Sequence, residues 1–253
     1  MSDDDLGTAY RPARPPERVV SLVPSLTETV ALSARGLLVG ATDWCSHPAD
    51  LNVPRVGGTK WPDLTAVQAL EPDLVLANAE ENRAEDIAAL RSAGLAVWVT
   101  APATVPAALS SLRRMLAALG ETRVPWLDEA DELWSGPATA TYHPVLVPIW
   151  RRPWMVLGRD TFAGDVLLRL GYSNVYGAHT DRYPKISLDE LRRHEVHTVV
   201  LPDEPYAFSA TDGPEAFPGR RCALVSGRYL TWYGPSLVEA PAVLSRQLQA
   251  AAP

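Results

Sequence analysis

The sequence lacks the long apolar runs that membrane insertion and export require. None of its 253 residues fall in a stretch of about 18 consecutive apolar residues, so no transmembrane span is expected. The start, M-S-D-D-D-L-G-T-A-Y-R-P-A-R-P-P, is acidic and rich in proline, whereas a secretory signal is basic and then apolar. We therefore expect a cytoplasmic protein, unless a signal was removed, with a flexible N-terminal arm over residues 1–17.

Cysteine is also scarce, and basic residues are outnumbered by acidic ones. The two cysteines, Cys45 and Cys222, lie far apart, so neither a disulfide framework nor a zinc finger is indicated. The net charge of −7 and the pI near 5.3 disfavour a nucleic-acid partner. The chain also has no Gly-x-Ser-x-Gly elbow, no phosphate loop and no dinucleotide-binding glycine motif, so three common enzyme classes are not indicated.

Short apolar runs alternate with helical patterns along the chain. This alternation predicts an α/β fold with parallel sheets and crossover helices. In the first half we expect strands at 19–23, 38–41, 74–77 and 96–100, and helices at 26–32, 66–70, 83–92 and 105–119. In the second half we expect strands at 145–149, 155–157, 198–201 and 222–225, and helices at 161–170, 188–194 and 236–250.

These two series predict two Rossmann-like lobes joined by a single rigid backbone helix. The connector, residues 123–134, places apolar residues at helical spacing and acidic residues on the opposite face. The expected boundaries are an N-terminal lobe at 18–120, a backbone helix and linker at 121–141, and a C-terminal lobe at 142–253. Each lobe is expected to repeat a similar topology.

Tryptophan is abundant, with eight residues. Five fall where a predicted strand meets a loop: Trp44, Trp61, Trp150, Trp154 and Trp232. Aromatic faces at such positions suit a flat macrocycle or ring system, although burial in the core is an equally good interpretation for any one of them. Trp98, between valines, and Trp134, on the connector, are assigned to packing.

Two polar groupings are candidate ligand contacts. Cys45 and His47 could bind a metal ion, and Glu80 and Glu81 could approach from the neighbouring loop, but a lone Cys-x-His is more often structural. Arg151, Arg152 and Arg159 could clamp carboxylate or phosphate groups. The alternative for these arginines is a solvated loop or pairing with neighbours such as Asp160 and Asp165.

Several segments together resemble the substrate-binding proteins of cobalamin and siderophore importers, the helical-backbone metal receptors of the periplasmic-binding-protein type, class III. The segments are R-V-V-S-L-V-P-S-L-T-E from residue 18, T-D-W-C from 42, V-G-G-T-K from 56, L-E-P-D-L-V from 70, G-R-D-T-F from 158 and L-G-Y-S-N-V from 170. The resemblance covers nearly all of residues 18–250. It implies a small-molecule ligand, cobalamin or another metal complex, held in a cleft between the lobes.

Carried onto this sequence, the resemblance implies a set of ligand-binding residues from both lobes. They are Pro24, Ser25, Trp44, Trp61, Glu80, Glu81, Trp150, Arg151, Arg152, Trp154, Arg159, Asp160, Tyr229, Trp232 and Tyr233. Trp61 stands where a cobalamin-binding relative has a tryptophan beside the corrin.

The sequence departs from the family at one docking position. Importer receptors present a glutamate on each lobe to arginines of the ABC permease, but here Thr65-Ala66-Val67 stands at the first position, while Asp189 or Glu190 suits the second. This disfavours coupling to a permease. Two other hypotheses stay open: a true import component whose signal was removed, and an enzyme on the same fold in which Asp160, Glu80, Glu81 and Tyr183 do acid–base work.

Overall fold

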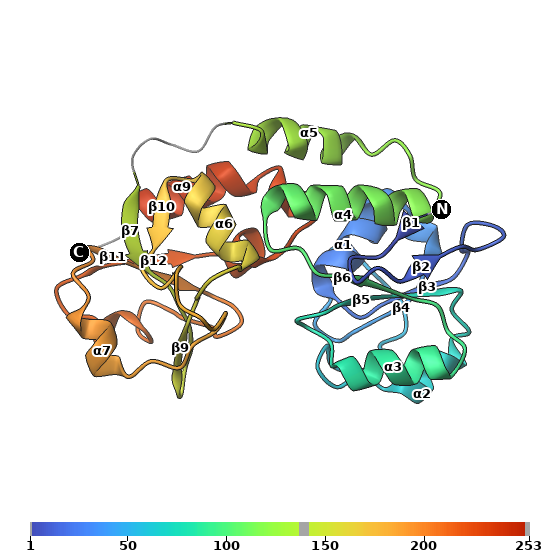
Figure 1. Ribbon diagram of the computed structural model, residues 1–253, viewed down its shortest axis with the longest axis horizontal. Coiled ribbons are helices and arrows are strands. Elements are labelled where there is room, and N and C mark those ends of the chain that lie inside the picture. Colours follow the sequence, from blue (N-terminus) through green and yellow to red (C-terminus); the bar gives the residue numbers. More distant parts are fainter. Residues whose placement is uncertain (1, 137–141, 251–253) are drawn as a thin grey trace. The chain divides into compact units, whose positions relative to one another are not determined.

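The computed structural model describes residues 2–136 and 142–250, which form two compact units (Figure 1). Unit 1 holds the residues up to Pro102, then Pro106–Ala130 and Tyr233–Pro235; unit 2 holds Ala103–Val105, Asp131–Trp232 and the residues from Ser236 on. The boundaries of these units differ in detail from those expected from the sequence. Helix α5 (Pro125–Trp134) contributes to both units, and part of the expected linker, residues 137–141, lies outside the described residues.

Unit 1 is built on a parallel sheet of four strands. They are β3 (Val19–Ser21), β4 (Leu38–Ala41), β5 (Leu74–Asn78) and β6 (Val97–Thr100), in the order β4-β3-β5-β6. Every residue of β3, β5 and β6 is buried, as expected for apolar strands covered on both faces. All four strands were predicted from their apolar runs.

Helices follow the strands of unit 1 as the alternation predicts. They are α1 (Pro24–Ser33), a 3-10 turn (Arg35–Leu37), α2 (Leu64–Ala69), α3 (Ala84–Ser92), α4 (Val105–Ala118) and the first part of α5. The Asp63 carboxylate caps α2 by accepting from the Ala66 N–H at 3.0 Å. Val20, Val75 and Val97 lie in one core cluster with Ile87 and Leu90 of α3. Helix α3 therefore packs against one face of the sheet.

The N-terminal residues form part of unit 1, where the sequence predicts a loose arm. Strand β1 (Ser2–Asp3) pairs antiparallel with β2 (Ala9–Tyr10), and the turn between them lies along the outer edge of β6. The Asp5 N–H donates to the Val99 carbonyl at 3.0 Å, and the Val99 N–H donates to the Asp4 carboxylate at 3.2 Å. The hairpin thus covers the edge strand of the sheet, which would otherwise be open to pairing.

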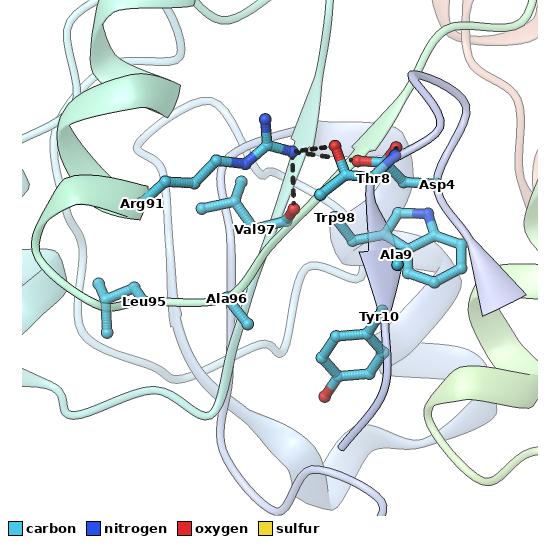
Figure 2. A pocket seen from close by; sticks show the side chains of 9 residues that line it. All are labelled: Asp4, Thr8, Ala9, Tyr10, Arg91, Leu95, Ala96, Val97 and Trp98. Atoms are coloured by element: carbon cyan, nitrogen blue, oxygen red, sulfur yellow. Dashed lines mark hydrogen bonds and ion pairs between the residues drawn. The ribbon is translucent and has the colours of Figure 1, made fainter. Parts of the chain in front are cut away.

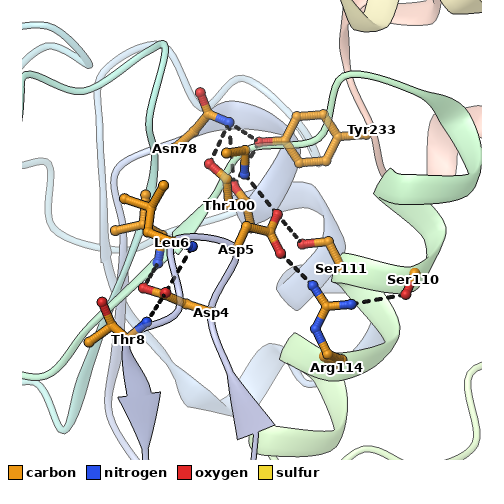
Figure 3. A network of polar contacts seen from close by, with 12 residues as sticks. Asp4, Asp5, Leu6, Thr8, Asn78, Thr100, Ser110, Ser111, Arg114 and Tyr233 are labelled. Carbon is orange, nitrogen blue, oxygen red and sulfur yellow. Dashed lines mark hydrogen bonds and ion pairs between the residues drawn. The ribbon is translucent and has the colours of Figure 1, made fainter.

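Two aspartates, the buried Asp4 and the half-buried Asp5, hold this hairpin in place. Asp4 pairs with Arg91 of α3 at 3.1 Å, beside a cavity of about 140 Å³ (Figure 2). Asp5 pairs with Arg114 of α4 at 2.5 Å and accepts from the Ser111 hydroxyl at 2.7 Å (Figure 3). Composition alone predicts a loose arm, because it cannot reveal that both carboxylates have partners far away in the sequence.

Unit 2 repeats the strand order of unit 1. Its parallel sheet contains β7 (His143–Leu146), β10 (Tyr172–Asn174), β11 (Thr198–Pro202) and β12 (Arg221–Val225), in the order β10-β7-β11-β12. In each sheet the second strand in sequence flanks the first, and the third flanks it on the other side. The expectation of a repeated topology is confirmed. Strand β10 was not predicted, because it is short and carries polar residues.

The remaining elements of unit 2 are mostly as predicted. An antiparallel hairpin of β8 (Pro148–Arg151) and β9 (Trp154–Val156) follows β7, so the single strand expected at 145–149 is interrupted at Val147. The helices are α6 (Phe162–Arg169), α7 (Leu188–Arg193), α8 (Gly227–Thr231) and α9 (Ala240–Gln249), with 3-10 turns at Pro214–Ala216 and Pro235–Leu237. Within the described residues, no helix has the length and apolarity to span a bilayer.

Candidate functional site

The carboxyl ends of the strands in unit 1 gather the loops that the sequence singles out. Because the strands are parallel, the segments that follow β3, β4, β5 and β6 emerge at one edge of the sheet. The order reverses between β3 and β5, and open α/β sheets bind ligands at the carboxyl ends beside such a reversal. The loops involved are the start of α1, residues 42–45, residues 57–61 and residues 78–82.

Two tryptophans stand exposed on adjacent loops at this edge. Trp44 is 70 % exposed and Trp61 is 69 % exposed, the highest values for large hydrophobic side chains in the described ranges. The loops are joined where the Asp43 N–H donates to the Gly57 carbonyl at 2.9 Å. An exposed indole loses the stabilisation that burial provides, so two on neighbouring loops indicate a binding surface.

The loop of Trp61 is shaped by glycine. Gly57 has φ of 81°, and a side chain there would lie 3.2 Å from both the Asp63 nitrogen and the Trp61 carbonyl oxygen. A side chain on Gly58 would lie 3.7 Å from the Trp44 indole nitrogen. Gly57 therefore permits the tight turn, whereas a side chain on Gly58 would make only an ordinary contact with Trp44.

Arg83 covers one face of Trp61. Its guanidinium carbon lies 3.8 Å from the ring centroid, a cation–π contact. The same guanidinium makes two hydrogen bonds to the Asp86 carboxylate, at 2.8 and 2.6 Å. Asp86 thus fixes the arginine, and the arginine fixes the indole.

The loop after β5 brings carboxylates to the same edge. Glu80 and Glu81 are partly exposed, and their N–H groups donate to the Asn78 side-chain oxygen at 2.8 and 3.0 Å. The Lys60 ammonium, from the loop of Trp61, donates to the Glu80 carbonyl. With Asp43, which is exposed, three acidic residues lie on the loops of this edge.

Pro24 and Ser25, which the resemblance implies as ligand contacts, are buried at the start of α1. Ser25 is only 2 % exposed. Gly234 packs on this turn, because a side chain on Gly234 would lie 3.1 Å from the Ser25 carbonyl oxygen. In unit 1 as described, these two residues support the edge rather than present side chains at it.

The metal-binding hypothesis for Cys45 and His47 gains no third ligand. The Cys45 thiol lies between the hydroxyls of Thr27 and Thr42, at 3.0 and 3.1 Å, and burial raises its pKa. The His47 ring bonds to the Ser46 hydroxyl at 3.0 Å. Among residues 2–136 and 142–250, no group of three or more His, Cys, Asp or Glu side chains could hold a metal ion. The metal site stays a prediction.

Trp150 and Trp154 of unit 2 lie on opposite sides of the β8–β9 hairpin turn and differ in role. Trp154 stacks on Phe208, with 6.1 Å between centroids and 14° between planes, and packs against the core cluster of unit 2. Trp150 is 40 % exposed and meets Tyr206 edge-on at 5.6 Å. Of the two, Trp150 has the surface that a ligand contact requires.

The arginines proposed as an anion clamp are largely engaged by acids of unit 2. Arg151 forms ion pairs with Asp212 and Glu215, and Arg159 pairs with Asp160 at 2.6 Å. Arg152 is exposed. The pairing with Asp160 is the alternative that the sequence left open. The pairing of Arg151 with Asp212 and Glu215 could not be foreseen, because these acids lie some sixty positions away in the sequence.

The segment 229–233 is also occupied by internal contacts. Tyr229 donates to the Glu239 carboxylate at 2.6 Å. Trp232 is 8 % exposed and hydrogen-bonds Glu204; burial, with the nearby charge of Asp203, raises the pKa of the Glu204 carboxyl. Trp232 is therefore a packing residue within the described structure, where the sequence predicts a ligand contact.

Tyr233 belongs to unit 1, where its hydroxyl joins a buried network (Figure 3). It lies 2.6 Å from the Asn78 amide nitrogen and 2.8 Å from the Thr100 hydroxyl. Asn78 and Thr100 end strands β5 and β6. The network thus connects the loop of Glu80 and Glu81 to the next strand of the sheet, a role that the sequence did not reveal.

We expect Tyr233→Phe to flatten the alkaline loss of stability. Burial, then the Glu81 carboxylate, raises the pKa of the Tyr233 phenol. Since the folded pKa exceeds the ordinary value near 10, the contribution of the neutral phenol is complete below about pH 10 and is lost as pH rises further. Urea unfolding between pH 8 and 11 measures this, with Tyr142→Phe, at an exposed tyrosine, as the control. Equal pH slopes in wild type and Tyr233→Phe would contradict it.

The hollows found in unit 1 lie away from this edge. The cavity of about 140 Å³ beside Asp4 is too small for a macrocycle. An open groove of about 480 Å³ is lined by residues 9–16 with Asp73 and Ala96. Asp73 and Ala96 directly precede β5 and β6, so this groove lies at the amino ends of the strands. Neither hollow contains a residue that the sequence assigned to ligand binding.

No family model matches the chain, but individual relatives do. The vitamin B12-binding protein of Pectobacterium atrosepticum is 22 % identical over 200 residues, 74 % of this chain and 71 % of that protein. The periplasmic vitamin B12-binding protein BtuF of Vibrio cholerae has a TM-score of 0.72 at 17 % identity, covering 93 % of this chain and 97 % of BtuF.

Haem-binding proteins are equally similar in structure. The periplasmic heme-binding protein BhuT, solved in complex with two hemes, has a TM-score of 0.74 at 25 % identity, covering 91 % of this chain and 97 % of BhuT. The resemblance read from the sequence motifs is confirmed by these matches. The chain has the α/β fold of the class III periplasmic binding proteins, with two parallel sheets, and the curated relative named above is a vitamin B12-binding protein.

Proposed function

We propose that this protein is a substrate-binding protein for a flat metal-containing macrocycle, with a corrinoid as the first candidate and haem or another metal chelate as the second. The observation that carries the proposal is the pair of exposed tryptophans, Trp44 and Trp61, on adjacent loops at the carboxyl edge of the unit 1 sheet. The ligands named for the similar proteins, vitamin B12 and haem, support the same ligand class.

The charges around the tryptophans favour a corrinoid over haem. A corrin ring carries mainly neutral amide side chains, whereas haem carries two carboxylates. Asp43, Glu80 and Glu81 are acidic; of the nearby cations, Arg83 is paired with Asp86, and Lys60 donates to the neutral Glu80 carbonyl. A carboxylate ligand would meet more acidic than basic groups on these loops, while amides can donate to carboxylates.

A titration series tests the proposal. Cyanocobalamin, dicyanocobinamide, hemin and a ferric siderophore are each titrated into the protein by calorimetry, with absorption spectra recorded for the coloured ligands. We expect micromolar or tighter binding of the corrinoids and at least about tenfold weaker binding of hemin, a difference of about 1.4 kcal/mol. Absence of binding by every ligand would refute the proposal. A ligand recovered chemically altered would instead favour the enzyme hypothesis.

The cellular role is a separate part of the proposal. We propose weak coupling to an ABC permease, because the family resemblance implies a docking glutamate where this chain has Thr65 of α2; we also propose a cytoplasmic location, as a receptor or carrier. Fractionation of native cells, with detection by antibody, tests the location. Co-purification with a membrane permease would overturn this part without affecting the ligand assignment.

A further inference from the structure

Asn82 is a buried side chain that meets three separate segments of unit 1. It is 3 % exposed and lies in the loop between β5 and α3. Its side-chain oxygen accepts from the Asn78 N–H at 2.8 Å, and its amide nitrogen donates to the Thr59 carbonyl at 2.9 Å and the Leu22 carbonyl at 3.4 Å. The acceptor and both donors of the amide are therefore used.

Each partner belongs to a different part of the ligand edge. Leu22 directly follows β3, Asn78 ends β5, and Thr59 lies in the loop of Trp61. Asn82 thus joins this loop to the ends of the two strands between which the sheet order reverses. The next residue, Arg83, lies over the Trp61 ring. The segment Asn82–Arg83 therefore fixes both the backbone of the Trp61 loop and one face of the Trp61 ring.

Apart from the backbone bond between the Asp43 N–H and the Gly57 carbonyl, the other hydrogen bonds that side chains make to the Trp61 loop are longer or more exposed. The hydroxyls of Thr42 and Thr59 are 3.4 Å apart, and the contact between Lys60 and the Glu80 carbonyl lies at the surface. A buried amide with three partners holds a loop more firmly than exposed contacts do, because water competes for exposed groups.

We propose that Asn82 is a positioning residue for ligand binding: it fixes the loop of Trp61 against the ends of β3 and β5 and thereby sets the affinity that Trp61 provides. The inference rests on the proposed function, since it takes Trp61 as a ligand contact. A small displacement of a contact group is costly in a preorganised site. Asn82 itself touches the protein and need not touch the ligand.

A double-mutant cycle separates positioning from a general structural role. We expect Asn82→Ala to weaken corrinoid binding about tenfold in the wild-type background, corresponding to one or two lost hydrogen bonds. In the Trp61→Ala background the same change should weaken binding less than about twofold, because the positioned group is gone. Additive effects in the two backgrounds would overturn the inference.

Hydrogen exchange of the apo protein provides a readout that needs no ligand. Amides of the segment 57–62, in which Pro62 carries no N–H, should exchange faster in Asn82→Ala, while those of β11 and β12 in unit 2 should not change. Asn52→Ala is the matched control, because Asn52 is an exposed asparagine of the same unit. Unchanged exchange at 57–62 would overturn the inference even if the wild type binds no ligand, an outcome that would refute the proposed function separately.

A milder variant guards against loss of folding. Asn82→Ser keeps a polar hydroxyl in the buried site, but its side chain is one atom shorter and cannot reach both carbonyls. It should show the same faster exchange at 57–62 and the same non-additivity with Trp61→Ala, each to a smaller extent. Wild-type exchange together with wild-type affinity in this variant would contradict the positioning role.

Discussion

Replacing Asp4 by alanine is expected to lower the free energy of unfolding by about 3 kcal/mol or more. The Asp4 side chain is 1 % exposed and pairs with Arg91 at 3.1 Å. It also accepts from the N–H groups of Leu6, Thr8 and Val99, at 3.0, 2.7 and 3.2 Å. Its loss removes the ion-pair partner of Arg91 and the acceptor of the three N–H groups. Urea unfolding followed by circular dichroism measures the effect.

Asp3→Ala is the control for this prediction, since it changes the same residue type one position away. The Asp3 side chain is 54 % exposed and pairs with Arg11 at 2.5 Å, also at the surface. Exposed ion pairs contribute at most about 1 kcal/mol. If the two alanine variants lose the same small amount of stability, the N-terminal hairpin is not the fixed part of unit 1 described above.

Replacing Trp44 and Trp61 together by alanine is expected to weaken corrinoid binding by about 30-fold or more, corresponding to at least about 1 kcal/mol for each ring. The stability of the apo protein should change little, because both rings are about 70 % exposed and contribute little buried area. Calorimetric titration gives the affinity, and urea unfolding gives the stability.

Leu32→Ala is the control for the tryptophan pair. Leu32 is a large hydrophobic residue of unit 1, 56 % exposed, and lies in the last turn of α1, at the opposite end of that helix from the ligand edge. It should leave the affinity unchanged. Wild-type affinity in the double tryptophan variant would assign both rings to the surface of the scaffold and leave the ligand class without its main support.

The fold of both units was largely predictable because the buried strands are short apolar runs separated by helical patterns. Strand β5, L-V-L-A-N, is buried throughout, and Trp98, predicted to pack, is 1 % exposed. Strand β10 and the N-terminal hairpin were missed for one reason. Neither has an apolar run, and each depends on partners distant in the sequence.

The candidate site was predictable in its location but only partly in its residues. Strand ends can be read from the sequence, and so can the loops of Trp44, Trp61 and Glu80. Which side chains face solvent cannot be read from the sequence, because this depends on tertiary partners. Arg151 is engaged by Asp212 and Glu215, and Trp232 is buried beside Glu204.

Asparagine carries less signal in a sequence than tryptophan. Asn78 and Asn82 organise the ligand edge of unit 1 through buried amides, yet an Asn at the end of a strand usually marks a turn. Their spacing, with one at the last residue of an apolar strand and one four positions later, is the signal that could have indicated a supporting pair.

The most direct test of the account is the hydrogen-exchange footprint of the ligand on the protein. With saturating cyanocobalamin, we expect slower exchange in residues 42–45, 57–62 and 79–83 of unit 1, because these loops carry the two exposed tryptophans and the carboxylates beside them. The same loops should show no protection in the Trp44→Ala/Trp61→Ala variant at equal ligand concentration. Wild-type protection confined to other segments, such as the groove of residues 9–16, or no protection at all, would contradict the account.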